Sequence, residues 1–454
     1  MKHDADILIV GGGLSGCALA AALADGRRKI IVLEARQGKN PRFNGELIHP
    51  TGVDVLAARG MLAPLEAAGA AQVLGFAGVP APGKPATVLP YREIPGSTPF
   101  GIGIDHRHLV DVLRREVDKL KPFVEVRTGE RVTDVIRDQE RVIGVQATSG
   151  PIYAPVVLAC DGRHSKVRTL LGMEEHAKLL SFTAAALLAD CKLPQPGFGH
   201  IFLGGWGPVL AYPIGKTDAR ACIDLPADMD RGTDAVIARV RVDYLPYLAP
   251  SVRASLLLAL DAGEIELAAN YAIYTDECTV PGAALVGDAC GCSHPLTATG
   301  MTIALNDTRL VAEALAGVEL SSRTQVDAAL ARYQTDRYRY VRAREILADA
   351  LYEVFRGVDD GTRAIREGIF QYWESSEGAR ARSMALLSGH ESRLPAFLRE
   401  YLTVVLMSTS SVLRGQVNDP TLAGKLRSLV GLGRKSIEKL GLAAKGIREG
   451  NLRV

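Results

Sequence analysis

Cysteine is scarce in this chain of 454 residues, and its scarcity excludes a disulfide framework. The odd number and wide spacing of the seven cysteines predict a reducing compartment. Cys290 and Cys292 form a C-x-C pair, but no second pair stands at the spacing of a zinc site. We therefore expect small buried cysteines and no metal.

No charge of one sign dominates the composition either. The formal net charge is +2, so no global field favours nucleic acid or acidic partners. Charged residues make up 23% and apolar residues 47% of the chain, which excludes intrinsic disorder and a bundle of membrane-spanning helices. The first apolar run begins at Ile7 and is broken by three glycines at 11–13, so we do not expect a signal peptide. The predicted location is the cytoplasm.

The chain opens on a strand, a tight glycine turn, a helix and a second strand. Residues 6–10 are an apolar run, GGGLSG follows, and a second apolar run ends at Glu34. In this βαβ fingerprint Gly11 allows the turn, Gly13 lets the backbone approach a pyrophosphate, and Gly16 lets the helix pack on the strand. Glu34 lies where a carboxylate accepts a hydrogen bond from a ribose hydroxyl, and the helix N-terminus faces the phosphates. The segment predicts dinucleotide binding.

Two aspartates follow later apolar runs that we expect to be buried strands. Asp161 comes directly after the run at 155–160. Asp288 belongs to the segment VGDA and lies two residues after the run at 283–286. Open α/β sheets bind ligands at the carboxyl ends of their strands, so both side chains are expected beside the glycine turn. One dinucleotide with a ribitol chain would use all three motifs.

Three short motifs and two longer segments carry a family resemblance. GGGLSG, DGRHSKVR and Gly287-Asp288 resemble the three FAD motifs of the group A FAD-dependent monooxygenases, and in particular of the squalene monooxygenase (squalene epoxidase) family. Residues 34–52 are similar to that family's segment ending in G-E-L-L-Q-P-G-G. Residues 287–307 are similar to its G-D-A…H-P-L-T-G-G-G-M-T-V-A-L-S-D. The resemblance covers roughly residues 5–345.

The resemblance implies the cofactor and the residues that hold it. FAD would be bound with its pyrophosphate on the glycine turn and its ribitol at Asp288, and Glu34 would hold the adenosine ribose. The further FAD-binding residues that it implies are Arg42 and Arg107 beside the ADP half, Asp161 in the second motif, and Pro295, Gly300 and Met301 at the isoalloxazine ring, where a helix N-terminus favours the negatively charged reduced flavin.

The resemblance also implies the reaction. NADH or NADPH would reduce FAD, O₂ would form a flavin C4a-hydroperoxide, and this would epoxidise or hydroxylate a hydrophobic substrate in a site closed to water. The expected substrate is a prenylated aromatic of the quinolone type from secondary metabolism, or an isoprenoid. The first alternative is a flavin-dependent reductase of prenyl double bonds, similar to geranylgeranyl reductases. A flavin halogenase is less favoured because no W-x-W-x-I-P run exists, and a non-catalytic flavin-binding or membrane-scaffold protein is the last alternative.

We therefore predict an α/β fold without internal repeats, in which a Rossmann-like FAD-binding domain interleaves with an antiparallel-sheet substrate domain and a helical region follows. The predicted boundaries are 1–72, 100–176 and 277–345 for the FAD-binding domain, 73–99 and 177–276 for the substrate domain, and 346–454 for the helical region.

Changes near the expected substrate site set this chain apart from the family pattern. His49 stands where the family has glutamine, and the nearby family tyrosine falls on Phe76. Trp206 and Tyr212 are candidates for the apolar walls of the pocket. One hypothesis is that His49 orients or deprotonates an aromatic substrate beside the flavin. The other is that it bonds to backbone near FAD.

The C-terminal part is basic and amphipathic. Residues 414–454 carry nine Lys and Arg against three acids. The longest uncharged run of the C-terminal part, 401–413, is too short to span a bilayer. Leucines and isoleucines from Leu422 to Ile447 recur at helical spacing. Such a helix is typical of peripheral membrane contact, here through 401–454 on the inner face of the membrane, although a terminal helix packed on the body fits the same pattern.

Overall fold

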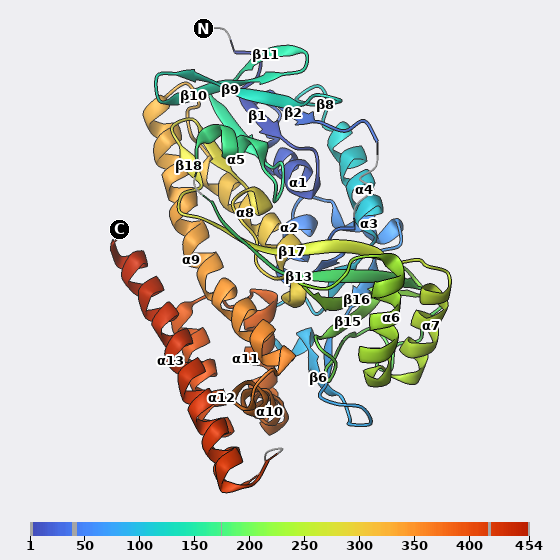
Figure 1. Ribbon diagram of the computed structural model, residues 1–454. Helices are drawn as coiled ribbons and strands as arrows, with labels where there is room; N and C mark the ends of the chain where they lie inside the picture. Colours follow the sequence, from blue (N-terminus) through green and yellow to red (C-terminus); the bar gives the residue numbers. More distant parts are fainter. Residues whose placement is uncertain (1–2, 39–42, 174, 416–418, 453–454) are drawn as a thin grey trace.

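The opening segment folds into the parallel βαβ unit that its glycine turn predicts. It consists of β1 (Ile7–Val10), α1 (Leu14–Leu23) and β2 (Ile30–Glu34). The structure is a computed structural model that describes residues 3–38, 43–173, 175–415 and 419–452, the last ten by their backbone alone. In the described chain this unit belongs to a six-stranded sheet (Figure 1). The sheet has the order β18 (Thr279–Val280), β19 (Ala283–Leu285), β12 (Val156–Ala159), β1, β2 and β8 (Val124–Thr128).

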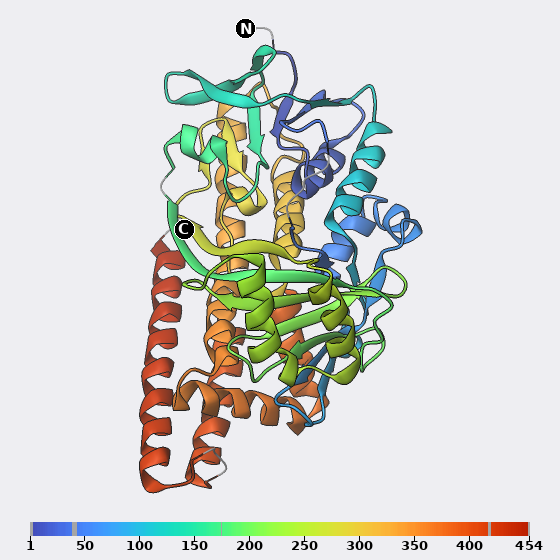
Figure 2. The same cartoon turned by 45° about the vertical axis from the view of Figure 1, so that its right-hand side comes forward.

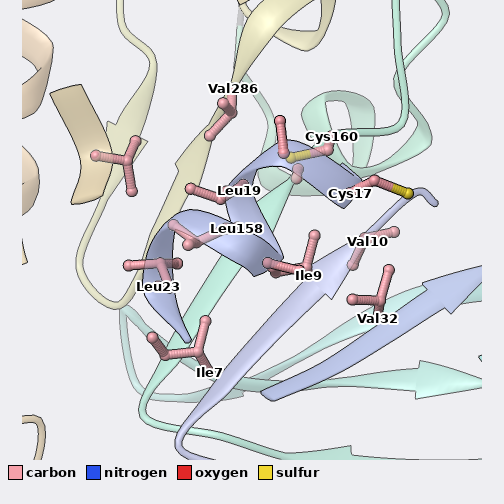
Figure 3. Close-up of a cluster of buried hydrophobic side chains, with 14 of the residues drawn as sticks. Ile7, Ile9, Val10, Cys17, Leu19, Leu23, Val32, Leu158, Cys160 and Val286 are labelled. Atoms are coloured by element: carbon pink, nitrogen blue, oxygen red, sulfur yellow. The ribbon is translucent and has the colours of Figure 1, made fainter. Parts of the chain in front are cut away.

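The strands of this sheet are continuous apolar runs because they are buried in one core with helices such as α1 and with a further layer of strands between residues 132 and 154. Ile7, Leu8 and Ile9 of β1 are fully buried. Figure 3 shows Ile7 and Ile9 beside Leu19 and Leu23 of α1, whose alanine- and leucine-rich sequence favours a helix. Burying each large apolar side chain stabilises the fold by roughly 1.5–3 kcal/mol. This packing fixes the glycine turn at the carboxyl end of β1.

A seven-stranded sheet lies beneath the first (Figure 2). It is antiparallel except where β5 pairs with β14 in parallel. Its order is β17 (Glu266–Thr275), β13 (Glu175–Leu188), β16 (Asp218–Pro226), β15 (Val209–Ile214), β14 (Gly199–Phe202), β5 (Gly75–Val79) and β6 (Thr87–Pro90). The predicted antiparallel sheet is therefore confirmed.

One face of this second sheet packs on two helices that the sequence pattern did not predict. They are α6 (Thr233–Asp243) and α7 (Pro250–Asp261). Strand periodicity points Ala219, Ala221 and Ile223 of β16 into this cluster, so Arg220 and Asp224 face the other way. The polar face of the sheet is thereby turned toward the first sheet.

Smaller elements join the two sheets. One three-stranded sheet has the order β11 (Gly150–Tyr153), β10 (Arg141–Ala147), β9 (Val132–Asp138), and another β3 (Leu47–Ile48), β7 (Gly101–Gly103), β4 (Ala71–Val73). The helices of this part are α2 (Pro50–Ala57), α3 (Leu62–Ala67), α4 (His106–Asp118), α5 (Lys166–Leu171) and α8 (Gly300–Ala314). The seven cysteines carry no disulfide.

The C-terminal part is helical, as predicted. It consists of α9 (Arg323–Arg356), α10 (Asp360–Ser375), α11 (Glu377–Ser388), α12 (Leu394–Leu413) and α13 (Leu422–Leu452). Helix α9 runs from the first sheet down to the other helices, and α13 forms the outer edge of the molecule (Figure 1). Among the residues described, no helix is long and apolar enough to cross a membrane.

Candidate active site

A large cavity opens between the two sheets. Its volume is about 1090 Å³, at or above the upper end of the roughly 300–1,000 Å³ of most ligand sites. Its walls come from the carboxyl ends of β1, β2 and β12, from the polar face of the second sheet, and from the loop before α8. The volume leaves room for a dinucleotide together with a second molecule.

The glycine turn forms one end of this cavity. Gly11 has φ +104°, and a Cβ there would lie 2.4 Å from the carbonyl oxygen of Cys160. A Cβ on Gly13 would meet no atom within 4 Å, so its backbone is open to the cavity. Helix α1 begins here without a side-chain cap, which leaves its first N–H groups free for an anion. The geometry therefore fits a pyrophosphate.

Gly16 has a structural role instead. It does not line the cavity, and a Cβ there would lie 1.8 Å from the carbonyl oxygen of Gly11. This close approach holds α1 against the turn, as the fingerprint predicts.

Glu34 lies at the end of β2 and lines the same end of the cavity. Its Oε2 accepts a hydrogen bond from the N–H of Gly12 at 2.9 Å and pairs with Arg114 at 2.9 Å. Arg114 also donates to the carbonyl oxygen of Gly12 at 2.8 Å. Sequence reasoning named Arg107 on this helix and missed Arg114, although two turns of helix place both on one face.

The two aspartates lie where the strand pattern places them. Asp161 accepts hydrogen bonds from Ser165 Oγ at 2.6 Å and from the N–H of Val167 at 3.1 Å. Both Asp161 and Asp288 line the cavity, and burial raises the pKa of each carboxyl. Arg107 lines it as well and pairs with Asp105 at 3.2 Å.

Two other predictions concern Arg42 and a metal site. Arg42 lies outside the described residues. No cluster of three His, Cys, Asp or Glu side chains able to hold a metal occurs in the described part of the chain.

The loop before α8 forms the middle of the cavity wall. Pro295, Gly300 and Met301 all line it. Helix α8 begins at Gly300 without a side-chain cap, so its free N–H groups suit an anionic ring. Ala298 adopts φ +52°, a conformation that favours glycine, which is the residue of the family pattern here.

His49 is fully buried and does not line the cavity. Its Nε2–H donates to the carbonyl oxygen of Thr297 at 2.9 Å, and its Nδ1 accepts from the Tyr91 hydroxyl at 2.6 Å. Burial lowers the pKa of the imidazole to about 4, so the ring is neutral near pH 7. The hypothesis that His49 deprotonates a substrate is therefore wrong for this geometry, because neither nitrogen is free. The alternative, a histidine bonded to backbone beside the cofactor loop, fits.

Buried neutral histidines predict acid sensitivity. Burial also lowers the pKa of His200 to about 4, against 6.5 for an exposed histidine. Between these values the unfolded chain binds more protons than the folded one, so stability falls as pH falls. We expect the two histidines together to contribute a loss of about 3 kcal/mol in the free energy of unfolding from pH 6.5 to pH 5, measured as the slope that disappears from denaturant titrations when both are replaced by glutamine. His49→Gln should remove about half of this slope, and an unchanged slope would contradict the assignment.

Of the three predicted wall residues, only Tyr212 lines the cavity. Phe76 does not line the cavity, and the centre of its ring lies 5.8 Å from that of the His49 ring. Trp206 turns toward α9, where the Arg356 guanidinium lies 4.1 Å from its ring centre. The sequence pattern identifies apolar runs, but it does not show which of their side chains face the cavity.

The wall at Tyr212 is polar and charged. Glu46 and Arg220 form a buried ion pair with two contacts of 2.8 Å, and the Tyr212 hydroxyl donates to Glu46 at 3.2 Å. Glu46 belongs to the family-like segment, directly before β3 of the small three-stranded sheet, and Arg220 belongs to β16, so the pair joins that segment to the seven-stranded sheet. Burial raises the pKa of Glu46, and Arg220 works against that rise.

A second polar group lies farther along β16. Asp224 Oδ1 accepts hydrogen bonds from Ser181 Oγ at 2.5 Å and from His294 Nε2 at 3.2 Å. His294 Nδ1 accepts from the N–H of Leu296 at 3.1 Å. Because the hydroxyl proton of Ser181 points to Asp224 and the histidine acceptor is taken, this is not a nucleophile. The group instead fixes the loop before α8.

Family models and curated proteins match this chain in the part that forms the glycine turn and the cavity. The family model described as squalene epoxidase matches residues 153–425, and that of an NAD(P)-binding Rossmann-like domain matches residues 9–56. A squalene epoxidase of Aspergillus fumigatus is 30% identical over 430 residues, covering 91% of this chain and 88% of its own length. Squalene epoxidase 3 of Arabidopsis thaliana is 28% identical, covering 90% of this chain and 79% of its own.

Solved structures share the fold. The p-nitrophenol 4-monooxygenase PnpA of Pseudomonas putida superposes with a TM-score of 0.72 at 20% identity, over 86% of this chain and all of that chain. PqsL of Pseudomonas aeruginosa, described as a probable FAD-dependent monooxygenase, superposes with a TM-score of 0.67 at 22% identity, over 78% of this chain and 97% of that chain. With the geometry of the cradle, these findings identify an FAD-dependent monooxygenase that uses NAD(P)H, and the chain belongs to the squalene epoxidase family.

Proposed function

We propose that the protein adds one oxygen atom from O₂ to a hydrophobic substrate, by epoxidation or hydroxylation. The observation that supports this is one cavity with two kinds of wall. One end is the dinucleotide cradle, and farther along Leu210, Leu296 and Met301 supply apolar surface. The substrate class is an isoprenoid or a prenylated aromatic molecule.

The chain's own residues bind and orient the cofactor. Gly11, Gly13 and the start of α1 would hold the pyrophosphate, and Glu34 the adenosine ribose. Arg107 would lie beside the ADP half of FAD, and Asp161 and Asp288 would contact its middle. When bound, FAD supplies the activation of O₂ with electrons from NAD(P)H.

The loop before α8 would set the flavin ring against the substrate. Pro295, Gly300 and Met301 would border the ring, and the N-terminus of α8 would favour the negatively charged reduced flavin. His49 acts on this loop as a positioning residue through the carbonyl oxygen of Thr297. The apolar wall excludes water, which the reaction requires.

The test is product analysis with isotopic oxygen. Purified protein with FAD, NAD(P)H and ¹⁸O₂ would be offered squalene, shorter isoprenoids and prenylated quinolones. We expect one ¹⁸O atom in the product and no product without O₂. A saturated product formed anaerobically would instead support the reductase alternative.

Gly13→Ala tests the cradle. The added Cβ meets no protein atom within 4 Å, so the fold should tolerate it, yet it would stand where the pyrophosphate approaches. We expect at least about tenfold weaker FAD binding by fluorescence titration, equal to about 1.4 kcal/mol, with an unchanged Tm of the FAD-free protein. Gly433→Ala, at an equally open position on α13, is the control and should bind FAD normally.

We also propose that α13 contacts the inner face of the membrane. Four apolar side chains lie on its outward face and are between 54% and 76% exposed: Leu422, Leu426, Val430 and Ile437, called here the α13 stripe. The opposite face packs on the body, where Leu432 is buried. An exposed apolar stripe on a basic helix is typical of an interfacial element.

Serine substitution in the α13 stripe tests this contact. We expect the triple variant Leu422→Ser, Val430→Ser, Ile437→Ser to lose more than tenfold in binding to vesicles of phosphatidylcholine and phosphatidylglycerol, because each apolar side chain contributes about 1.5–3 kcal/mol. The matched control changes Val242 and Leu258, both 72% exposed on α6 and α7, to serine. Equal sedimentation of both variants with vesicles would reject the proposal.

A further inference from the structure

A buried positive charge lies where α9 meets the residues that support the loop before α8. Arg344 of α9 is only 3% exposed. Its guanidinium stays protonated, because arginine does not lose its proton inside proteins. The charge does not line the flavin cavity and belongs to none of the motifs that hold the cofactor.

Two hydrogen bonds to one oxygen connect Arg344 to this support. Its Nη2–H donates to the carbonyl oxygen of Ser388 at 3.1 Å, and the Thr51 hydroxyl donates to the same oxygen at 3.0 Å. Thr51 lies in the first turn of α2, two residues after His49, whose imidazole donates to the carbonyl oxygen of Thr297 in the loop. Arg344 therefore lies directly behind the segment that holds the loop beside the cavity.

The field of this charge reaches the loop support. Burial lowers the pKa of the His49 imidazole, and the charge of Arg344 lowers it further. His49 itself is neutral near pH 7, so it neither adds to the charge of Arg344 nor cancels it.

No carboxylate neutralises Arg344 either. Among the residues whose side chains are described, none forms an ion pair with it, and its Nε and Nη1 have no hydrogen-bond partner there. Asp307 acts on it from farther away, but Asp307 is paired with Arg337 at 2.8 Å. The ring of Tyr340, 4.2 Å away, and the carboxyl end of α11 attract the charge without cancelling it. One uncompensated positive charge therefore remains in the interior.

Such a charge costs stability, because it has lost its hydration without gaining a counter-ion. Replacing buried charged groups by well-packed hydrocarbon is often neutral or stabilising. The fold nevertheless makes room for this one: Gly389 has φ +76°, and a Cβ there would lie 0.6 Å from Nη2 of Arg344. A charge that the packing does not need, kept at a cost, points to a role in function.

We propose that Arg344 raises the reduction potential of the bound flavin through the field of its charge. The reduced flavin ring is negatively charged, so a positive charge behind the loop stabilises it more than the oxidised ring, and the low dielectric of the interior strengthens the effect. The N-terminus of α8 acts in the same direction. This role depends on the proposed function, which places the flavin ring at the loop.

The midpoint potential of the bound FAD tests this role without any substrate. FAD-loaded protein would be reduced slowly without O₂, beside a reference dye. Arg344→Gln keeps a donor for the carbonyl oxygen of Ser388 but removes the charge. We expect the ratio of reduced to oxidised flavin at a fixed potential to fall at least about threefold, a shift of about 14 mV for two electrons.

Arg339→Gln is the matched control. It removes one positive charge from the same helix, but the Arg339 side chain is 63% exposed, so water and salt screen its charge. The potential of this variant should stay unchanged. An unchanged potential in Arg344→Gln, or an equal shift in Arg339→Gln, would overturn the proposal.

Arg344→Met gives a second measurement and replaces Arg344→Gln if that variant does not fold. It should lower the potential equally, while the Tm of the FAD-free protein stays the same or rises, because an unpaired buried charge is removed. A lower Tm with an unchanged potential would show that Arg344 only supports the fold. Unchanged protein that takes up no FAD would instead refute the proposed function itself.

Discussion

Replacing His49 by alanine is expected to lower product formation about a hundredfold, whereas replacing it by glutamine should change it less than about threefold. The imidazole joins Tyr91 to the carbonyl oxygen of Thr297, and the backbone N–H of His49 donates to Thr302 Oγ1 at 2.9 Å. Alanine removes both side-chain bonds and leaves their buried partners unsatisfied, at about 1–3 kcal/mol each. The loop beside the flavin then loses its support.

Glutamine reproduces both bonds. Its amide N–H can donate to Thr297 and its carbonyl oxygen can accept from the Tyr91 hydroxyl. Glutamine is also the residue of the family pattern at this position. The measurement is kcat and kcat/KM for oxygenated product from pH 6 to pH 9, with FAD binding determined in parallel. If His49 acted as a base, His49→Gln would be as impaired as His49→Ala, and the pH profile would lose one limb.

Local sequence signals were sufficient to predict the cofactor cradle. Gly11, Gly13 and Glu34 lie within one βαβ unit, so their spacing alone places them together. Asp161 and Asp288 follow strands whose carboxyl ends meet at one sheet edge. For such residues the sequence position within a strand–turn–helix unit is enough to predict the position in the folded protein.

The sequence could not decide between the two hypotheses for His49 because the partners of its side chain are distant in the chain. Thr297 lies 248 residues away and Tyr91 lies 42 residues away. The parallel pairing of β5 with β14 depends in the same way on tertiary structure, since it brings Phe76 opposite Gly199. Helices α6 and α7 were missed because the strand pattern on both sides of them was read as continuous.

Removing Glu46 is expected to have the largest effect on stability. Glu46→Ala leaves the Arg220 guanidinium, 5% exposed, without its main partner. Breaking a buried pair in this way costs about 3–5 kcal/mol. Asp105 lies 3.8 Å from Arg220 and compensates part of the charge, so we expect the lower end of that range in denaturant titrations.

The double variant Glu46→Ala, Arg220→Met separates the charge effect from the loss of packing. Because it leaves no unpaired charge, we expect it to be more stable than Glu46→Ala, with a coupling free energy of at least about 2 kcal/mol in the double-mutant cycle. Asp138→Ala is the control. It breaks a pair with Arg323 that also joins a carboxylate to a guanidinium but lies at the surface. That change should cost less than about 1 kcal/mol.

The same variants show whether this ion pair fixes the segment before β3 on the seven-stranded sheet. Glu46 lies directly before β3 and lines the cavity, and Arg220 lies on β16 beside Tyr212. If the pair fixes that distance, Glu46→Gln should retain FAD binding while raising KM for the substrate, because Tyr212 keeps an acceptor but the charge contact is lost. A Glu46→Ala protein with unchanged stability and unchanged KM would show that Asp105 alone neutralises Arg220 and that apolar contacts hold the segment before β3 on the sheet.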